Sequence, residues 1–139
     1  ATDYTLDVSG VPYPVGALSM GNPHCVVKVE SVAAARVETL GSDLGTHDYF
    51  PEDANVGFVE LVANDHIKLR VFERGVGETM ACGTGACAAM VYSRLKQWTV
   101  EKVKVSLPGG DLWISWAGDG HSVLMTGPSK TVFEGQIEI

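Results

Sequence analysis

The chain has 139 residues, of which 45% are hydrophobic and 19% are charged, and its formal net charge is -7. These values are typical of one globular domain with a buried core, and they exclude a disordered chain. The acidic balance and the scattered lysines and arginines argue against a sequence-independent nucleic-acid binder. No apolar run has the length of a membrane-spanning helix and no signal-peptide pattern opens the chain, so we expect no membrane partner.

The first half of the chain is predicted to be rich in strands, with one helix. A short apolar strand is expected at His24–Glu30. The stretch Val32–Gly45 has helical character, and Ser31 is placed to cap its N-terminus. Two further strands are expected at Asn55–Ala63 and His66–Glu73. Because a tight Asn-Asp turn joins them and the second alternates in hydrophobicity, they predict an antiparallel hairpin.

A second helix is expected from Gly83 to Gln97, and it has almost no charge as far as Val91. A helix that is apolar all round is buried on all sides, so in a domain of this size a sheet must surround it. Turn signals separate at least four later strands, which are predicted in the segments 100–107, 109–120, 121–127 and 130–139. The fold class is therefore predicted to be α+β, in one domain without linker or internal repeat.

The three cysteines are an odd number at spacings that match neither a disulfide framework nor a metal site. Cys82 and Cys87 are five residues apart on the second predicted helix, so their side chains point in different directions. A reducing cytoplasm is the natural setting for such a chain. The sequence opens at Ala1 in polar, strand-like residues, which suggests a domain taken from a longer protein.

Cys82 lies between a glycine-rich loop and the second predicted helix, in the stretch ERGVGETMACGTGACAAM. The first N–H groups of a helix have no partner within it, and the helix dipole adds positive potential there. This setting favours the thiolate form of cysteine, and Gly83 and Gly85 leave the amides open to an anion such as a carboxylate. A thiolate beside a bound carboxylate suggests that it removes the α-proton of an amino acid.

The same residues also have ordinary structural interpretations. Cys82 is compatible with a small buried residue at a glycine turn. Glu73 and Arg74 are compatible with exposed ion-forming residues that point to opposite sides of a strand end. His24 taken alone is more typical of a structural histidine, and Asn55 of a turn residue before a strand.

Taken together, four stretches resemble the diaminopimelate epimerase family, in its C-terminal half. They are SMGNPHCVV, FPEDANVGFVE, IKLRVFERGVGETMACGTGACAA and LPGGDLWISW, the last followed by MTGP. Their order and spacing match from about Gly16 to the end of the chain, and ERGVGETMACGTG is the most specific of them. The resemblance implies an epimerase without a cofactor or metal that interconverts LL- and meso-diaminopimelate in the biosynthesis of lysine and peptidoglycan precursors.

The resemblance also implies roles for individual residues. Two cysteines, one from each half of the enzyme, act as thiolate base and thiol acid on opposite faces of the α-carbon. The residues implied in catalysis on this chain are Cys82, Glu73 and His24. Those implied in substrate binding are Asn22, Asn55, Glu73, Arg74, Gly83 and Thr84.

Within the binding set, the amides of Gly83 and Thr84 hold the reacting carboxylate, and Glu73 lies near the reacting ammonium group. Arg74 reaches the distal carboxylate, and the two asparagines contact that same end. Cys25 and Cys87 match no role in the family, so we interpret both as packing residues.

The family fold is a mixed, strongly curved sheet wrapped around a central helix, one of two pseudo-symmetric halves. Compared with the family, the N-terminal half is expected to be absent. The partner cysteine has no candidate on this chain, because neither Cys25 nor Cys87 lies in a second glycine loop before a helix. We therefore predict that the isolated chain binds diaminopimelate weakly and does not epimerise it. Its expected partners are this substrate and the N-terminal half, and homodimerisation stays open.

Three other functions stay open. A proline or hydroxyproline racemase shares the cysteine before a glycine-led helix, although a diacid substrate needs a distal cation such as Arg74. A hydrolase would use Cys82 as nucleophile and His24 as base. A non-catalytic domain would bind an anion at the CGTG helix terminus.

Overall fold

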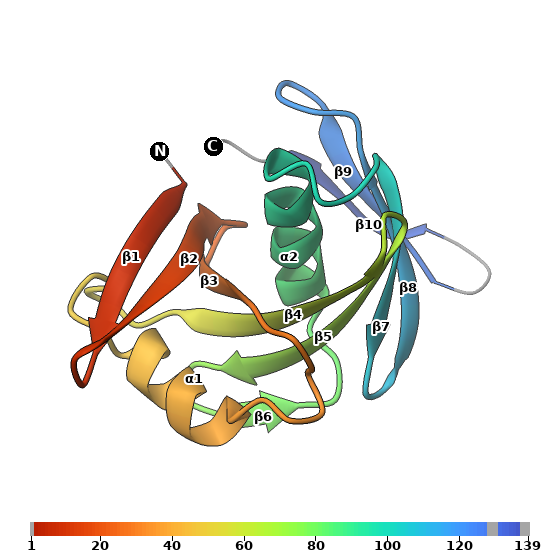
Figure 1. Cartoon of the computed structure of the whole chain (residues 1–139). Helices are drawn as coiled ribbons and strands as arrows, with labels where there is room; N and C mark the ends of the chain where they lie inside the picture. The colour runs from red at the N-terminus through yellow and green to blue at the C-terminus, as the bar shows by residue number, and fades with distance from the viewer. Residues whose placement is uncertain (1, 128–130, 137–139) are drawn as a thin grey trace.

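The computed structural model describes residues 2–127 and 131–136 of the chain. A ten-stranded sheet curves around helix α2 (Gly83–Leu95), while helix α1 (Val37–Gly45) lies on the outer side of the sheet (Figure 1). The predicted α+β class and the strongly curved sheet around a central helix are confirmed. Neither described helix has the length of a membrane-spanning one, since α2, the longer, has 13 residues.

The sheet is mixed. Its strands are β1 (Asp3–Val8), β2 (Val11–Ser19), β3 (Pro23–Lys28), β4 (Asn55–Ala63), β5 (His66–Glu73), β6 (Gly77–Thr79), β7 (Lys102–Leu107), β8 (Gly110–Trp116), β9 (Ser122–Thr126) and β10 (Thr131–Gln136). They follow one another in the order β1-β2-β3-β4-β5-β7-β8-β9-β10, and β6 pairs with β5. The β3–β4 and β5–β7 pairs are parallel, and the other pairs are antiparallel.

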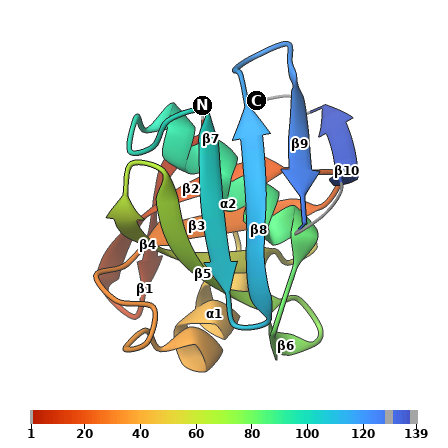
Figure 2. The same ribbon diagram turned by 90° about the vertical axis from the view of Figure 1, so that its right-hand side faces the viewer.

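The sheet buries a separate apolar core on each face. The inner core surrounds α2, whose residues from Gly85 to Ser93 are all buried. Figure 2 shows the strands β7, β8 and β9 covering this helix on the side opposite β2 and β3. The outer core lies under α1 and includes Val37, Leu40 and Leu44. Neighbouring residues of β3 divide between the two cores, since Val26 belongs to the inner core and Val27 to the outer one, as expected from the alternation of side chains along a strand.

Most of the predicted elements are confirmed. The β4–β5 hairpin has the predicted bounds, and β5 buries Ile67, Leu69 and Val71 on one face. Helix α2 begins at Gly83 as predicted but ends at Leu95, and the predicted terminus Gln97 has a positive φ of 62°. The four later strands are present, although the predicted residues 130 and 137–139 lie outside the described residues. The short strand β6 and the β1–β2 hairpin were not predicted.

The prediction that α1 starts at Val32 under a Ser31 cap is wrong. The helix begins at Val37, and its N-cap residue Arg36 makes no side-chain capping hydrogen bond. Ser31 Oγ instead accepts a hydrogen bond from the N–H of Ala34, at 3.4 Å, in a turn before the helix. Side chains of the sheet hold the Val32 backbone, because its N–H donates to a Glu60 carboxylate oxygen (3.0 Å) and its carbonyl accepts from Arg70 (2.6 Å).

Candidate functional site

Three strand ends meet at one edge of the sheet. Because β3 and β4 are parallel, their first residues lie at the same end of the strands, and His24 is opposite Asn55 in the register. Strand β5 runs antiparallel to β4, so its last residue, Glu73, lies at this edge too. The topology therefore brings together residues that lie about fifty positions apart in the sequence.

Asn55 connects the three strand ends through both atoms of its amide. Its Oδ1 accepts a hydrogen bond from the N–H of Arg74 (3.0 Å), and its Nδ2 donates to the carbonyl of Pro23 (3.4 Å). The Arg74 guanidinium donates in turn to the carbonyl of Glu52 (3.1 Å). Arg74 also lines a hollow of about 330 Å³, together with Gly21, Pro23, Phe50, Pro51, Glu52 and Asp53.

His24 is fully buried beside this cluster, with 1% of its surface exposed. Burial and, to a lesser degree, the positive charge of Arg74 together lower its pKa to about 4. The imidazole is therefore neutral at neutral pH. Its Nε2 lies 3.1 Å from Asn22 Oδ1; since an amide oxygen only accepts hydrogen bonds, the neutral ring donates through Nε2.

Cys82 is the N-cap residue of α2, as the sequence predicted for a cysteine at a helix start. Its backbone is extended (φ -146°, ψ 106°), and its Sγ accepts a hydrogen bond from the N–H of Gly85 at 3.4 Å. The hydroxyl of Thr84 lies 3.8 Å from the same sulfur. A Cβ atom at position 85 would lie only 3.1 Å from Sγ, so the glycine allows the sulfur to approach the amide. Cys82 is half-buried.

The other two cysteines pack in the two cores and are fully buried. Burial raises the pKa of Cys25 to about 12. Burial, together with a smaller contribution from Cys82, raises the pKa of Cys87 to about 12 as well. Both thiols are therefore protonated at neutral pH, as suits the packing role predicted for them.

Glu73 has a partner that sequence reasoning missed. Its Oε2 accepts a hydrogen bond from the Thr79 hydroxyl at 2.5 Å. Thr79 belongs to β6, and the hairpin register places it opposite Val71, on the same face of the sheet as Glu73. Gly75 and Gly77, both with positive φ, allow the tight turn of this hairpin. The GVGET motif could therefore have indicated the hairpin that brings Thr79 to Glu73.

The hydrogen bonds above divide the candidate residues into four groups. The first contains Asn22 and His24, and the second contains Pro23, Asn55 and Arg74. The third contains Glu73 and Thr79, and the fourth contains Cys82, Thr84 and Gly85. Within the described residues no hydrogen bond joins Cys82 to His24 or to Glu73.

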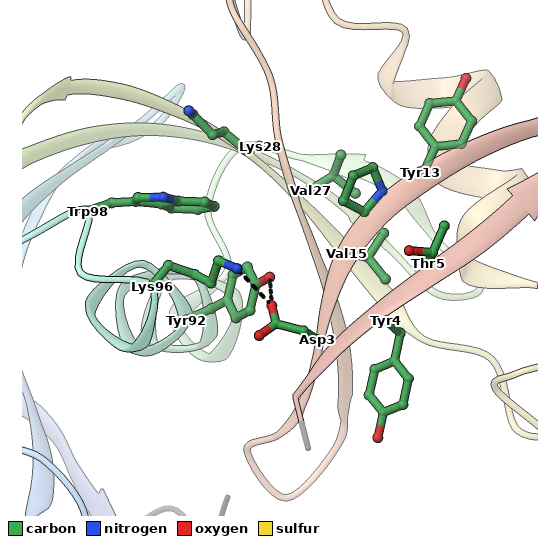
Figure 3. Close-up of a pocket in the computed structure, with 11 residues that line it drawn as sticks. Asp3, Tyr4, Thr5, Tyr13, Val15, Val27, Lys28, Tyr92, Lys96 and Trp98 are labelled. Atoms are coloured by element: carbon green, nitrogen blue, oxygen red, sulfur yellow. Dashed lines mark hydrogen bonds and ion pairs between the residues drawn. The ribbon is translucent and has the colours of Figure 1, made fainter.

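A second and larger hollow, of about 520 Å³, opens at the other end of α2 (Figure 3). Among the residues that line it are Tyr92 and Lys96, and the Tyr92 hydroxyl and the Lys96 ammonium both donate to Asp3. A helix of 13 residues is about 20 Å long. This hollow is therefore remote from Cys82 and does not belong to the candidate site.

Comparison with known proteins shows which family this chain is similar to. A family model described as Diaminopimelate epimerase matches residues 16–132. The chain is 56% identical, over its whole length, to a protein named Diaminopimelate epimerase from Alkalilimnicola ehrlichii, of which it covers 50%. It is 54% identical, over 98% of its length, to one from Halorhodospira halophila, of which it covers 47%. The chain therefore spans about half the length of these curated relatives.

Solved structures of phenazine biosynthesis proteins of the PhzF family are also similar. One from Bacillus anthracis matches 81% of this chain and 38% of its own, with a TM-score of 0.57 and 19% identity. One from Enterococcus faecalis matches 81% of this chain and 42% of its own, with a TM-score of 0.55 and 18% identity. At these identities the likeness concerns the fold alone.

Proposed function

This chain belongs to the diaminopimelate epimerase family, and from that premise we propose that it forms the C-terminal half of an epimerase that interconverts LL- and meso-diaminopimelate. The reaction is an α-proton transfer that uses cysteine side chains and needs no pyridoxal phosphate. We place this activity in the cytoplasm, in the synthesis of lysine and peptidoglycan precursors, where the three free thiols stay reduced.

One observation carries the proposal, namely the position of Cys82 as the N-cap of the buried helix α2. The first amides of a helix have no acceptor within it and bear a partial positive charge. The half-buried thiol therefore lies beside N–H groups that can donate hydrogen bonds to a carboxylate. In the proposed complex, the amides of Gly83 and Thr84 hold the reacting carboxylate next to the sulfur.

The proposed step is removal of the α-proton by the Cys82 thiolate. The C–H bond breaks and an S–H bond forms, while the electron pair stays on the substrate and is delocalised into the carboxylate. Helix amides that already point at this carboxylate stabilise the charge as it develops. Glu73 holds the ammonium group beside the reacting carbon, and the buried, neutral His24 supports the site as a hydrogen-bonding group rather than as a cation.

The distal end of the substrate is assigned to the cluster around Asn55. Arg74 is exposed and lines the hollow of about 330 Å³, so its guanidinium can pair with the distal carboxylate of a diacid. Asn22 and Asn55 complete this end, and Asn55 already fixes the Arg74 backbone. A distal cation of this kind favours a diacid over proline or hydroxyproline as substrate.

The second proton donor is proposed to come from the N-terminal half. Reprotonation on the opposite face needs a thiol that faces the substrate, and Cys25 and Cys87 are buried in the two cores. The chain covers only half of its curated relatives, which leaves room for another domain with that thiol. The isolated chain is therefore expected to be inactive.

The hydrolase alternative is less well supported. A Cys–His nucleophile needs the imidazole within hydrogen-bonding reach of the sulfur. Among the described residues, the partner of the His24 ring is Asn22, and the partners of Cys82 Sγ are Thr84 and Gly85. The anion-binding alternative uses the same helix terminus but assigns no role to the thiol.

Deuterium incorporation tests the proposal. The chain replaces the matching half of the Alkalilimnicola ehrlichii protein, and this two-domain protein is incubated with diaminopimelate in D₂O. We expect deuterium at the α-carbon, and we expect Cys82→Ser to slow the exchange by at least about a hundredfold. Absence of exchange in the two-domain protein would contradict the epimerase proposal. Ligand affinity nearly intact in Cys82→Ser, together with no exchange in the two-domain protein, would favour the anion-binding alternative. Exchange as fast in Cys82→Ser as in the parent would contradict the role of the thiolate.

A further inference from the structure

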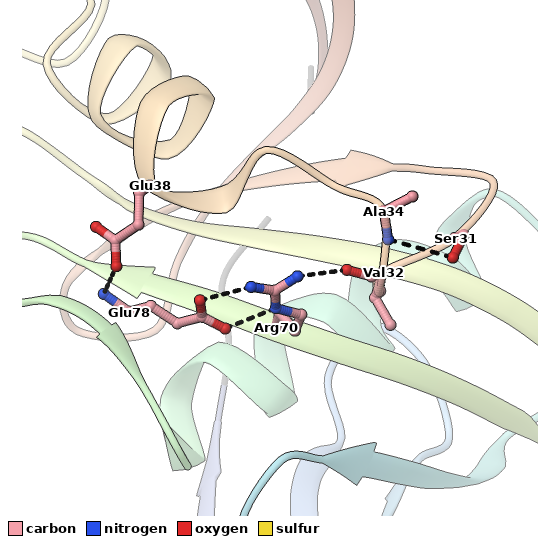
Figure 4. Close-up of polar contacts among 6 residues, drawn as sticks. All are labelled: Ser31, Val32, Ala34, Glu38, Arg70 and Glu78. Carbon is pink, nitrogen blue, oxygen red and sulfur yellow. Dashed lines mark hydrogen bonds and ion pairs between the residues drawn. The ribbon is translucent and has the colours of Figure 1, made fainter.

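Arg70 and Glu78 form a bidentate ion pair that the proposed reaction does not use. The guanidinium Nε and Nη2 donate to the two oxygens of Glu78 at 2.6 and 2.7 Å, and Nη1 donates to the Val32 carbonyl at 2.6 Å (Figure 4). Only 25% and 21% of the two side chains are exposed. The backbone N–H of Glu78 also donates to Glu38 of α1, at 3.4 Å. Strand β6 is thus tied to β5, to α1 and to the loop at Val32.

This ion pair and the candidate site lie on opposite faces of the same hairpin. Phe72 is opposite Glu78 and Val71 is opposite Thr79 in the register. Because side chains alternate along a strand, Arg70 and Glu78 share the face of Phe72, which packs against the outer core. Glu73 and Thr79 share the face of Val71, which belongs to the inner core around α2.

Strand β6 has only three residues, so little else fixes it. Its pairing with β5 comprises three residue pairs; Gly75 in the turn before it and Gly77, its first residue, both have positive φ. Cys82 follows Thr79 by three positions. A shift of β6 by one residue would turn Thr79 away from Glu73 and would move the start of α2.

We propose that Arg70 and Glu78 are positioning residues for the site, because they hold β6 in its register on β5. In this register Thr79 orients the Glu73 carboxylate, and the chain that follows β6 leads to Cys82 in the observed position. This inference rests on the proposed function. The planar guanidinium fork suits this task because its two parallel hydrogen bonds fix the direction of the Glu78 side chain as well as its distance.

The first measurement concerns the direct contact. In the two-domain protein described above, Thr79→Val removes the hydroxyl that donates to Glu73 and keeps a side chain of similar shape. We expect kcat/KM for α-proton exchange to fall about tenfold to a hundredfold, the range for a hydrogen bond to a charged group. Thr79→Ser keeps the hydroxyl and is expected to retain activity within about threefold.

The second measurement concerns the ion pair. Glu78→Gln keeps the length of the side chain and removes its charge, and we expect kcat/KM to fall about five- to tenfold, as suits a residue that acts through another. Where this variant unfolds below the assay temperature, Arg70→Lys takes its place, because it keeps the charge and loses the fork. Asp111→Asn is the matched control: it removes an ion pair between paired strands, that of Lys104 and Asp111 at 3.9 Å, away from β6.

A double-mutant cycle separates positioning from plain stabilisation. If Glu78 acts through Thr79, adding Glu78→Gln to Thr79→Val lowers kcat/KM by less than about twofold, although the melting temperatures continue to fall together. Effects on kcat/KM that simply multiply would overturn the inference, as would a Glu78→Gln protein as active as Asp111→Asn. A parent protein without exchange activity would instead overturn the proposed function, so the two failures are distinguishable.

Discussion

His24 and Asn55 are polar residues buried side by side in a sheet, where each must find hydrogen-bond partners inside the protein. They occupy the same register position in β3 and β4, and only 1% and 4% of their surfaces are exposed. Asn22, Pro23 and Arg74 supply the partners. An unsatisfied buried group costs about 1–3 kcal/mol, so loss of any one partner disturbs its neighbours. This mutual dependence fixes the geometry of this part of the candidate site.

The burial of His24 predicts that acid destabilises the protein. Its pKa is about 4 in the folded chain, compared with an ordinary value of 6.5, because burial and Arg74 oppose the charged form. Between these values the unfolded chain binds the proton and the folded chain does not, so the free energy of unfolding falls as the pH falls from 6.5 to about 4. Below that pH the loss from this residue levels off.

Urea unfolding midpoints across this pH range measure the effect. His24→Gln is expected to lower stability at neutral pH but to weaken its dependence on pH. His121→Gln changes an exposed histidine and is the matched control. A pH slope in His24→Gln as steep as in the parent chain would contradict the assignment.

The sequence alone was enough to predict the position of a site residue where that position depends only on neighbouring residues in the chain. The CGTG motif places Cys82 at a helix start whatever surrounds it, because small residues and an apolar run follow directly. Thr79 was missed because its partner Glu73 is six positions away and faces it only when the GVG turn closes the hairpin. Likewise, the ordinary view of Asn55 as a turn residue could not reveal that its amide connects two strands.

At the scale of elements, the two helices show what a sequence pattern can and cannot predict. Helix α2 is apolar on all sides, so both its existence and its burial followed from composition. Helix α1 was predicted five residues too long at its start because Glu60 and Arg70, far away in the sequence, hold the backbone of Val32. Strand β6 has three residues and no apolar alternation, and the contacts that it makes, its pairing with β5 and the Arg70–Glu78 ion pair, join it to residues outside its own segment.

The packing of α1 on β5 gives a prediction for Gly41. In a helix interior, Gly→Ala ordinarily stabilises by about 1 kcal/mol. Here a Cβ atom would lie 2.7 Å from Cβ of Phe72 and 2.8 Å from its Cγ. We therefore expect Gly41→Ala to lower the free energy of unfolding by about 1–3 kcal/mol through overpacking.

Thermal unfolding checks this sign. Ser42→Ala, on the exposed side of the same helix, is the control, and it is expected to leave stability unchanged or to raise it by about 0.5 kcal/mol. A Gly41→Ala chain that is more stable than its parent would show that Phe72 can move away from α1 at little cost.

At the scale of the whole molecule, the enclosed helix was predictable and the strand order was not. An apolar helix in a chain of this size needs sheet around it, and the later strands were recognisable from turn signals. The parallel β3–β4 and β5–β7 pairs, however, join segments separated by α1 or by α2. These long connections leave no local signature, yet the β3–β4 pair is what brings His24 and Asn55 to one edge.

The proposed second domain gives the prediction at this scale. On the proposed function, we expect the isolated chain to show α-proton exchange at least about a hundredfold slower than the two-domain protein, because the proposal assigns only one of the two thiols to this chain. The measurement is deuterium incorporation with equal concentrations of the two proteins. The isolated Cys82→Ser chain supplies the background rate. Exchange by the isolated parent chain at rates near those of the two-domain protein would show that one cysteine suffices.

The enclosure of α2 has a consequence for how the protein is made. The helix contacts β2, β3, β4 and β5, which precede it in the chain, and β7, β8 and β9, which follow it. On a ribosome, the nascent chain therefore exposes the apolar residues 85–91 of this helix until residues as late as Thr126 have been synthesised. Such segments are prone to aggregate and are bound by chaperones. The helix that positions Cys82 thus completes its burial late in synthesis, and defects in β8 or β9 would act first on the yield of folded protein.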